Sequence, residues 1–201
     1  MKITASQQAA LDAHLTATIP GTPATQHRAP RAFDGVIAAL VDPAEIEGSH
    51  GEYQRLQPAR WRVWVVTPTH LAYVEIKFDN EDDYDADEEA NRVIAPGQPF
   101  IRDPARGELV SAWVRPLVTA VKLTSESIGR DFNRWGHLLE FRLQSIAIEF
   151  ADGLRTPGEG SLRCGKQSHR VQGDAERWEG FIAAIREGSP YLTLELGALG
   201  L

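Results

Sequence analysis

Residues 60–78, RWRVWVVTPTHLAYVEIKF, constrain the fold of this chain more than any other segment. Valine, tryptophan, isoleucine and tyrosine dominate both halves of the segment, and these side chains favour the pleated, half-buried surface of a sheet. Thr67-Pro68-Thr69 separates the two halves with residues typical of a turn. The sequence therefore predicts a β-hairpin here, and with it an antiparallel sheet.

Two further segments have the composition of strands. Residues 109–124 predict a second pair of strands, interrupted near Pro116 because proline donates no hydrogen bond to a sheet. Residues 137–153 alternate apolar and polar side chains over a length that predicts a bend or turn near Gln144. We therefore expect six or seven strands.

Helical signals occupy the start of the chain. Leucine and isoleucine recur every four residues over 5–19, which predicts an amphipathic helix. The apolar spacing over 33–40 favours a second helix over a short buried strand. Asp42, followed by a proline, predicts about one more helical turn. The glycines of GSHG, residues 48–51, then predict a break in the chain.

The clearest helix signal is GDAERWEGFIAAIREG, residues 173–188. Trp178 and three other apolar residues share one face of this helix, while charged residues share the other. The segment that follows, 191–201, is too apolar for a free end. We expect it to pack on the body of the protein or on a second subunit.

These elements predict one α+β domain. We expect a strongly bent antiparallel β-sheet or barrel of six to seven strands, capped by a C-terminal α-helix and preceded by a helical N-terminal extension. The expected boundaries are 1–54 for the extension and linker, 55–188 for the barrel with its capping helix, and 189–201 for the apolar tail.

The order of these elements resembles the pleckstrin-homology-like barrel in its bacterial versions, over roughly residues 55–188. The similar segments are VVTPTHLAYV (65–74), RPLVTAV (115–121), IEFADG (148–153) and the helix around Trp178. His70 stands where the bacterial pattern usually has arginine. The resemblance implies a binding or scaffolding module from a family with no shared catalytic site.

The resemblance does not extend to lipid binding. Members of that family that bind phosphoinositides use lysine and arginine around the first hairpin, but the turn 67–69 has no basic residue. The nearest bases are Arg60, Arg62 and Lys77. A pI of 5.4 without a basic stripe also argues against a nucleic acid or an anionic membrane as the partner.

Two features bear on where the protein works. No apolar run reaches the roughly 20 residues of a membrane-spanning helix, and the start of the chain has no apolar core of a signal peptide. The single cysteine, Cys164, forms no disulfide within the chain and is typical of a reducing compartment. We therefore expect a cytoplasmic protein.

Eight acidic residues lie within DNEDDYDADEE, residues 79–89, and they account for the formal charge of −7. The residues with the spacing of the first calcium ligands in an EF-hand loop are Asp83, Asp85 and Asp87. However, Glu88 replaces the required glycine and Ile94 replaces the final glutamate ligand. A solvated loop is the favoured interpretation, while a cation site completed elsewhere and a contact with a basic partner stay open.

Other motifs lack the partners that their chemistry needs. GSLRCGK, residues 160–166, has the spacing of a phosphate-binding loop, but Gln167 replaces the residue that binds magnesium. Cys164 and His169 lie five residues apart without a catalytic signature. The six histidines show no spacing typical of a zinc site. We therefore expect no catalytic residue and no cofactor.

Tryptophans supply the candidate interaction residues. Trp61 and Trp64 point to opposite sides of one predicted strand, so one of them should enter the core. Exposed tryptophans on a sheet would mark an interaction surface, whereas covered ones would lie beneath the N-terminal helix or residues 79–107. Trp61, Trp64 and Trp113 are the candidates on these grounds.

The sequence thus favours a non-enzymatic binding or protein-interaction module, whose partner is another protein or a second copy of the chain. The alternative is a small enzyme with a site assembled from distant segments. A pocket lined by polar groups of perturbed pKa would favour the enzyme. The sequence points to no particular small-molecule ligand.

Overall fold

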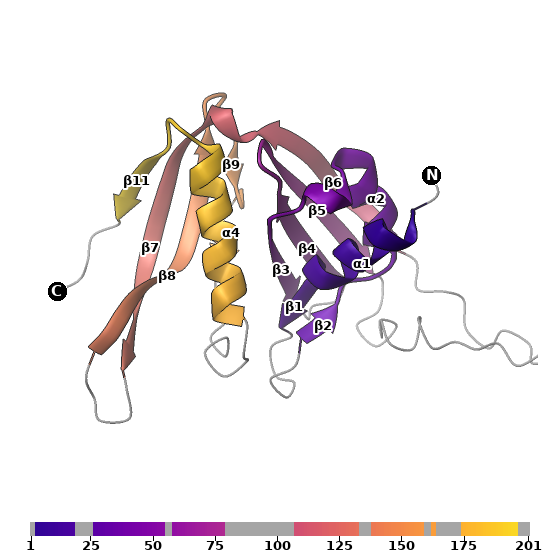
Figure 1. Ribbon diagram of the computed structural model, residues 1–201, viewed down its shortest axis with the longest axis horizontal. Helices are drawn as coiled ribbons and strands as arrows, with labels where there is room; N and C mark the ends of the chain where they lie inside the picture. Colours follow the sequence, from indigo (N-terminus) through magenta and orange to yellow (C-terminus); the bar gives the residue numbers. More distant parts are fainter. Residues whose placement is uncertain are drawn as a thin grey trace, which may run out of the picture.

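The computed structural model describes residues 3–18, 26–54, 58–78, 107–132, 138–158, 162–163 and 174–196 of the 201-residue chain. These residues form an N-terminal cap, two sheets and a long C-terminal helix (Figure 1). An N-terminal cap covers one face of a four-stranded sheet, and the long helix α4 lies between this sheet and a second one. The predicted α+β class, with an N-terminal and a C-terminal helix, is confirmed.

The cap contains α1 (Ala5–His14), β1 (Thr16–Thr18), β2 (Gln26–Arg28), α2 (Ala32–Leu40) and the short 3-10 helix η1 (Pro43–Glu45). The first helix is shorter than predicted, because the chain leaves α1 after His14 and continues as β1, which pairs antiparallel with β2. The predicted second helix and the helical turn after Asp42 are both confirmed.

A cluster of ion pairs holds the cap together. Asp34 of α2 is buried, and its carboxylate accepts hydrogen bonds from Arg28 at 2.5 Å, from Gln8 of α1 at 2.9 Å and from Arg31 at 3.3 Å. Arg28 and Arg31 also contact Asp12, at 2.9 and 2.7 Å. The buried charge of Asp34 therefore has the partners that its removal from water requires.

The four-stranded sheet contains β3 (Gly48–Gln54), β4 (Ala59–Val66), β5 (His70–Phe78) and β6 (Gly107–Pro116), paired antiparallel in that order. The predicted hairpin is β4 and β5, joined through residues 67–69. The strand β3 was not predicted, because its glycines indicated a break. A Cβ on Gly48 would lie 2.9 Å from the Cα of Phe181, and one on Gly51 would lie 2.6 Å from the carbonyl oxygen of Thr16. These glycines permit close packing instead of a turn.

The second sheet contains β7 (Ala120–Phe132), β8 (Leu138–Phe150) and β11 (Thr193–Leu196), with the short strands β9 (Arg155–Thr156) and β10 (Leu162–Arg163) paired to β8. The predicted turn near Gln144 is wrong, since β8 continues through it. The pairing of β8 with β7 nevertheless skips Gln144, which is an irregularity of the bulge type. The start of the apolar tail forms β11, which pairs parallel with β7.

Two hydrophobic cores lie on the two faces of the four-stranded sheet. The first packs Trp61, Val63 and Val74 against Leu11 of α1 and Phe33 of α2. The second packs the other face against α4 (Asp174–Gly188) and the second sheet; its members include Trp64, Leu71, Ile146, Trp178 and Phe181. Alternate side chains of β4 thus enter different cores.

No closed barrel forms among the described residues, so the barrel alternative of the prediction is wrong for this part of the chain. A barrel would require hydrogen bonds between the two sheets. Instead β6 continues through the 3-10 helix η2 (Leu117–Thr119) into β7, and these two strands do not pair with each other. The fold therefore keeps strand edges that a barrel would remove.

Candidate functional site

The face of the four-stranded sheet toward α4 carries a row of rings, one from each strand. The pairing places His50 beside Trp64, Trp64 beside Tyr73 and Tyr73 beside Trp113. The ring centroids of these three pairs are 5.8, 4.9 and 5.3 Å apart. Trp178 of α4 adds an edge-on contact with His50 at 4.9 Å. This aromatic row joins the sheet to the helix by packing.

An ionic row lies next to the aromatic row on the same face. Glu75 of β5 is only 7% exposed. Its carboxylate accepts a hydrogen bond from the hydroxyl of Tyr73 at 2.7 Å and another from Arg60 at 3.2 Å, and the Nε of Arg62 lies 3.5 Å away. Burial, and then the hydrogen bond and charge of Glu75, raise the pKa of Tyr73. Tyr73 therefore stays protonated and acts as a donor, not as a base.

Hydrogen bonds from two indoles link the helix and the two sheets. Trp64 Nε1 donates to Thr156 Oγ1 of β9 at 2.8 Å, and Trp178 Nε1 donates to the carbonyl oxygen of Leu143 in β8 at 2.5 Å. The first donor lies on the four-stranded sheet and the second on α4, and both acceptors lie on the second sheet. These two tryptophans therefore stabilise the packing of α4 and the two sheets, and both indole N–H groups have hydrogen-bond partners inside the protein.

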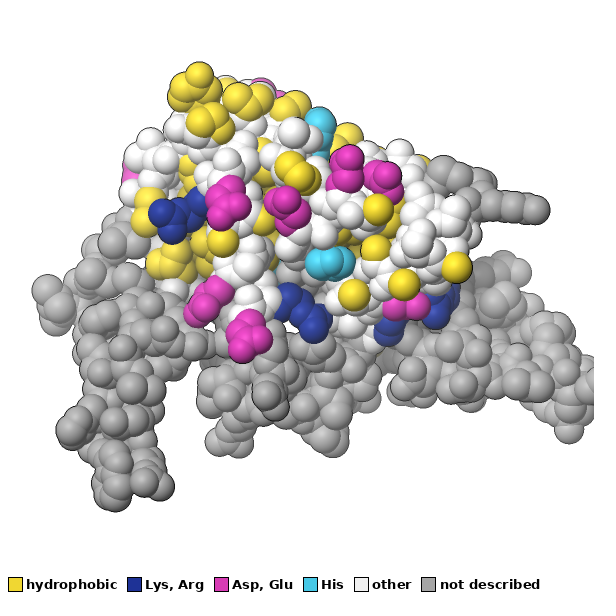
Figure 2. Space-filling view, in the orientation of Figure 1, with side chains coloured by type: hydrophobic (Ala, Val, Ile, Leu, Met, Phe, Trp, Pro, Cys, Tyr) yellow, Lys and Arg dark blue, Asp and Glu magenta, His cyan; other side chains and the backbone are white. Residues whose placement is uncertain are grey.

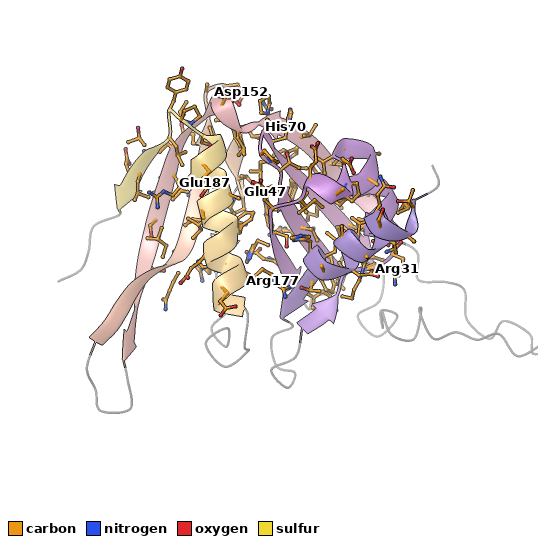
Figure 3. The ribbon with its side chains drawn as sticks, in the orientation of Figure 1. Arg31, Glu47, His70, Asp152, Arg177 and Glu187 are labelled. Atoms are coloured by element: carbon orange, nitrogen blue, oxygen red, sulfur yellow. The ribbon has the colours of Figure 1, made fainter. Side chains whose placement is uncertain are left out.

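A corner cluster lies where α4, β3 and the cap meet. Arg177, near the N-terminal end of α4, contacts the hydroxyl of Thr16 (Figure 3). Burial and the positive charge of Arg177 lower the pKa of His14. The hydroxyl of Ser49 donates to the carbonyl oxygen of His14 at 2.7 Å, and it lies 3.5 Å from the Nδ1 atom of the same residue.

This corner cluster is not arranged as a nucleophile and its base. A catalytic serine donates its hydroxyl proton to the imidazole ring of a histidine, whereas Ser49 donates to the main chain of His14. Ser49 is also only 2% exposed. The two groups with the clearest pKa shifts in the interior, His14 and Tyr73, lie in separate clusters. Among the described residues, His14 and Tyr73 therefore do not form a shared acid–base pair.

The outer strand β6 differs from the rest of the sheet in its exposure. Leu109, Val110 and Val114 are 52, 46 and 39% exposed. In the part of the chain that the structure describes, β5 pairs with one edge of β6 and no strand pairs with the other. Every second residue of such a strand directs its N–H and C=O groups away from the sheet. This free edge of β6 is an open hydrogen-bonding surface of the four-stranded sheet, and among the described residues it is the one that carries exposed aliphatic side chains.

A second exposed apolar group lies at the end of the molecule where η2 and the loop after α4 come together. Tyr191 is 73% exposed and Val118 is 50% exposed. Figure 2 shows apolar side chains over the loop between α4 and β11, with acidic side chains along α4 below them. These residues lie outside any strand edge, so they offer side chains but no row of backbone groups.

The structure separates the candidate interaction residues. Trp61 and Trp64 are both fully buried, Trp61 beneath the cap and Trp64 beneath α4. Trp113, on β6, is half-buried at the end of the aromatic row. The sequence left an edge, a bulge or a strand start open at Pro116, and Pro116 is the last residue of the terminal strand β6. The uncharged run LVSAWV, residues 109–114, was not recognised as a binding surface.

The other candidates of the sequence lie outside the described residues. These are the acidic segment 79–89 with Asp83, Asp85 and Asp87, and the pair Cys164 and His169. Only Leu162 and Arg163 of the glycine-rich segment 160–166 are described, as β10. The described residues hold no group of three or more His, Cys, Asp and Glu side chains placed to bind a metal ion.

None of the described helices combines the length and the apolar character that a membrane crossing needs. The chain matches no protein-family model, no curated protein and no solved structure.

Proposed function

We propose that this chain is a non-enzymatic protein-interaction module, and that it binds an extended segment of a protein along the free edge of β6. The observation that carries the proposal is the exposure of β6, whose ten residues form a sheet edge with three exposed aliphatic side chains. A segment added to this edge would continue the sheet by backbone hydrogen bonds.

The lack of protection along β6 supports this proposal. Edge strands of soluble proteins are usually short, or carry charges or proline that block pairing with other chains. In β6 the charges Glu108 and Arg115 stand near the two ends, and Pro116 is the last residue. The six residues between the charges contain neither charge nor proline. Such a segment pairs readily with another strand.

The proposed fold relationship is to the pleckstrin-homology-like group. Its support is the order of the elements: a four-stranded antiparallel sheet, a second sheet whose long strands β7 and β8 are antiparallel, and a C-terminal helix that packs between them through Trp178. The described residues form two sheets joined through η2, where the prediction had one strongly bent sheet or barrel. The cytoplasm is the proposed compartment, supported by the single cysteine of the sequence.

Site-specific crosslinking tests the proposed binding edge. A photo-crosslinking amino acid is placed at Ala112 of β6, which is exposed, and in a matched variant at Ala183, which is exposed on α4. We expect covalent adducts with a polypeptide from position 112 and none from position 183 when both variants are irradiated in the cells that make them. The adducts should disappear when Val114→Lys is added, because a charged side chain on an edge strand opposes pairing.

Two results would contradict the proposal. One is the absence of adducts from position 112. The other is an equal yield from positions 112 and 183, which would show contact without preference for the edge of β6.

A further inference from the structure

We infer that the segment bound at the free edge of β6 is β6 of a second copy of this chain, in antiparallel orientation. This inference rests on the proposed function, and it names the partner. The two copies would be related by a two-fold axis, so that each offers the same strand to the other. Their four-stranded sheets would then join into one continuous sheet.

The charges of β6 favour pairing with itself in this orientation. Glu108 stands near the start of the strand and Arg115 near its end. Antiparallel pairing places Glu108 of each copy beside Arg115 of the other, whereas parallel pairing would place like charges together. Their partners on β5, Lys77 and Leu71, are an even number of residues apart. Glu108 and Arg115 therefore lie on the same face of the sheet, which the contact requires.

Each of these charges already has a partner within its own copy. Glu108 contacts Lys77 at 3.2 Å, and Arg115 contacts Asp152. A second copy would extend each pair into a group of four alternating charges. Because all four side chains are at the surface, we expect this to set the orientation of the strands more than the strength of their pairing.

The exposed aliphatic side chains are arranged in the same self-complementary way. Leu109 lies near the start of the strand and Val114 near the end. On β5 they pair with Ile76 and Ala72, which both belong to the core beneath the cap. Leu109 and Val114 therefore share the cap side of the sheet. Antiparallel pairing brings Leu109 of each copy beside Val114 of the other and removes both from water.

The size of this contact predicts a weak dimer. A single pair of strands buries less than the roughly 1,200 Å² at which stable interfaces begin. We therefore expect a dissociation constant in the micromolar range, on the order of 10–100 μM.

The free edge of β11, at one end of the second sheet, is a poorer partner for β6. The outer strand β11 has only four residues, and its Glu195 is bound to Lys122 of β7 at 2.7 Å. Pairing of β6 with β11 of another copy would also be head-to-tail, which generates open chains and not a closed dimer. The mass of the assembly therefore distinguishes the two arrangements.

Sedimentation of the full chain, from about 1 μM to about 300 μM, tests the inference. We expect the mass to rise from monomer to dimer and to stop there. Val114→Lys should weaken the dimer at least tenfold. Val118→Lys is the matched control, since Val118 is at least as exposed but lies in η2. It should leave the dissociation constant unchanged.

A charge exchange tests the antiparallel orientation. Glu108→Arg and Arg115→Glu should each weaken the dimer about three- to tenfold, and the double variant should recover most of the loss, because opposite charges then face each other again. Thermal unfolding of the monomers checks that removing the ion pairs with Lys77 and Asp152 has not changed the fold.

Four results would overturn the inference: a monomer at every concentration, a mass that rises beyond dimer, a dimer that Val114→Lys leaves intact, or a double variant no better than the single ones. A monomer whose crosslinks from position 112 lead to a different protein would overturn the inference and leave the proposed function standing. A monomer without such crosslinks would reject both.

Discussion

The two outer strands of the four-stranded sheet, β3 and β6, differ in exposure, and the difference is the opposite of what their compositions suggest. The strand β3, GSHGEYQ, is polar and rich in glycine, yet all seven of its residues are buried or half-buried. The strand β6, GELVSAWVRP, is more apolar, yet seven of its ten residues are exposed. The chain packs its own elements over both faces of the polar outer strand, whereas most of the apolar outer strand is left exposed.

The cover over β3 explains this difference. On one side α4 packs against β3, with Phe181 against Gly48, and on the other side β1 packs against it, with Thr16 against Gly51. A larger side chain at either glycine would prevent α4 or β1 from packing this closely against β3. By contrast, the cap reaches β6 mainly through α2, and the second core ends at Trp113. Apolar strands without such a cover mark interaction sites in soluble proteins.

The largest effect that we predict comes from filling the space above β3. Gly48→Val should lower the free energy of unfolding by about 3 kcal/mol, because the new side chain meets the backbone of Phe181 and cannot be accommodated without moving α4. The matched change on β6, Ala112→Val, should alter it by less than about 0.5 kcal/mol, since Ala112 is exposed. Urea unfolding measures both values, and similar losses would contradict the difference between the two edges.

This difference also shows how far the sequence predicts the fold. The hairpin of β4 and β5 was predicted from its side-chain composition and its turn residues, and the helix α4 from the spacing of its apolar residues. The strand β3 was missed because Gly48 and Gly51 have the same appearance in a sequence whether they make a turn or allow close packing. The positions of Phe181 beside Gly48 and of Thr16 beside Gly51, both distant in the sequence, decide between these uses.

The candidate site was hidden from the sequence for a related reason. The sequence identified Trp61, Trp64 and Trp113 as residues that an interaction surface would use, but a residue type does not reveal how many elements pack over a strand. Trp64 and Trp113 lie in one aromatic row and differ because Trp64 is fully buried in the second core, whereas Trp113 is half-buried at its margin beside Phe150 of β8. Burial of this kind depends on contacts between distant segments, which one sequence does not specify.

The second prediction compares a buried charge with an edge charge. Glu75→Gln should cost about 2 kcal/mol of stability, because it removes a carboxylate that accepts hydrogen bonds from Tyr73 and Arg60 inside the protein. Glu108→Gln on β6 should cost less than about 0.5 kcal/mol, since the side chain of Glu108 is 71% exposed.

Thermal and urea unfolding of the two glutamine variants would provide these values at protein concentrations near 1 μM, where we expect a monomer. If Glu75→Gln lost as little stability as Glu108→Gln, the hydrogen bonds and ion pairs of Glu75 would add nothing to the stability of the sheet.

The smallest effect concerns the pH dependence of the cover over β3. Because the pKa of His14 is lowered in the folded protein, the unfolded chain takes up a proton near pH 6.5 that the folded protein does not. Stability should therefore fall as the pH drops below 6.5, and we expect this fall to be smaller than the loss caused by Glu75→Gln. His14→Gln should remove this part of the pH dependence and leave the stability above pH 7.5 nearly unchanged.

The stability difference between pH 7.5 and pH 5.5, measured for both proteins, checks this prediction. An identical fall in the wild-type protein and in His14→Gln would show that His14 does not carry the acid sensitivity of the covered edge.

Hydrogen exchange at the backbone amides of β3 and β6 tests the central claim most directly, because it reports which edge another chain covers. The claim predicts that the exchange of β3 does not change with protein concentration. In β6, the amides directed away from β5 should exchange fast near 1 μM and slowly near 300 μM in the wild-type protein, and fast at both concentrations in Val114→Lys. Equal exchange of β6 at the two concentrations would contradict the claim that this strand is the binding edge for a second copy.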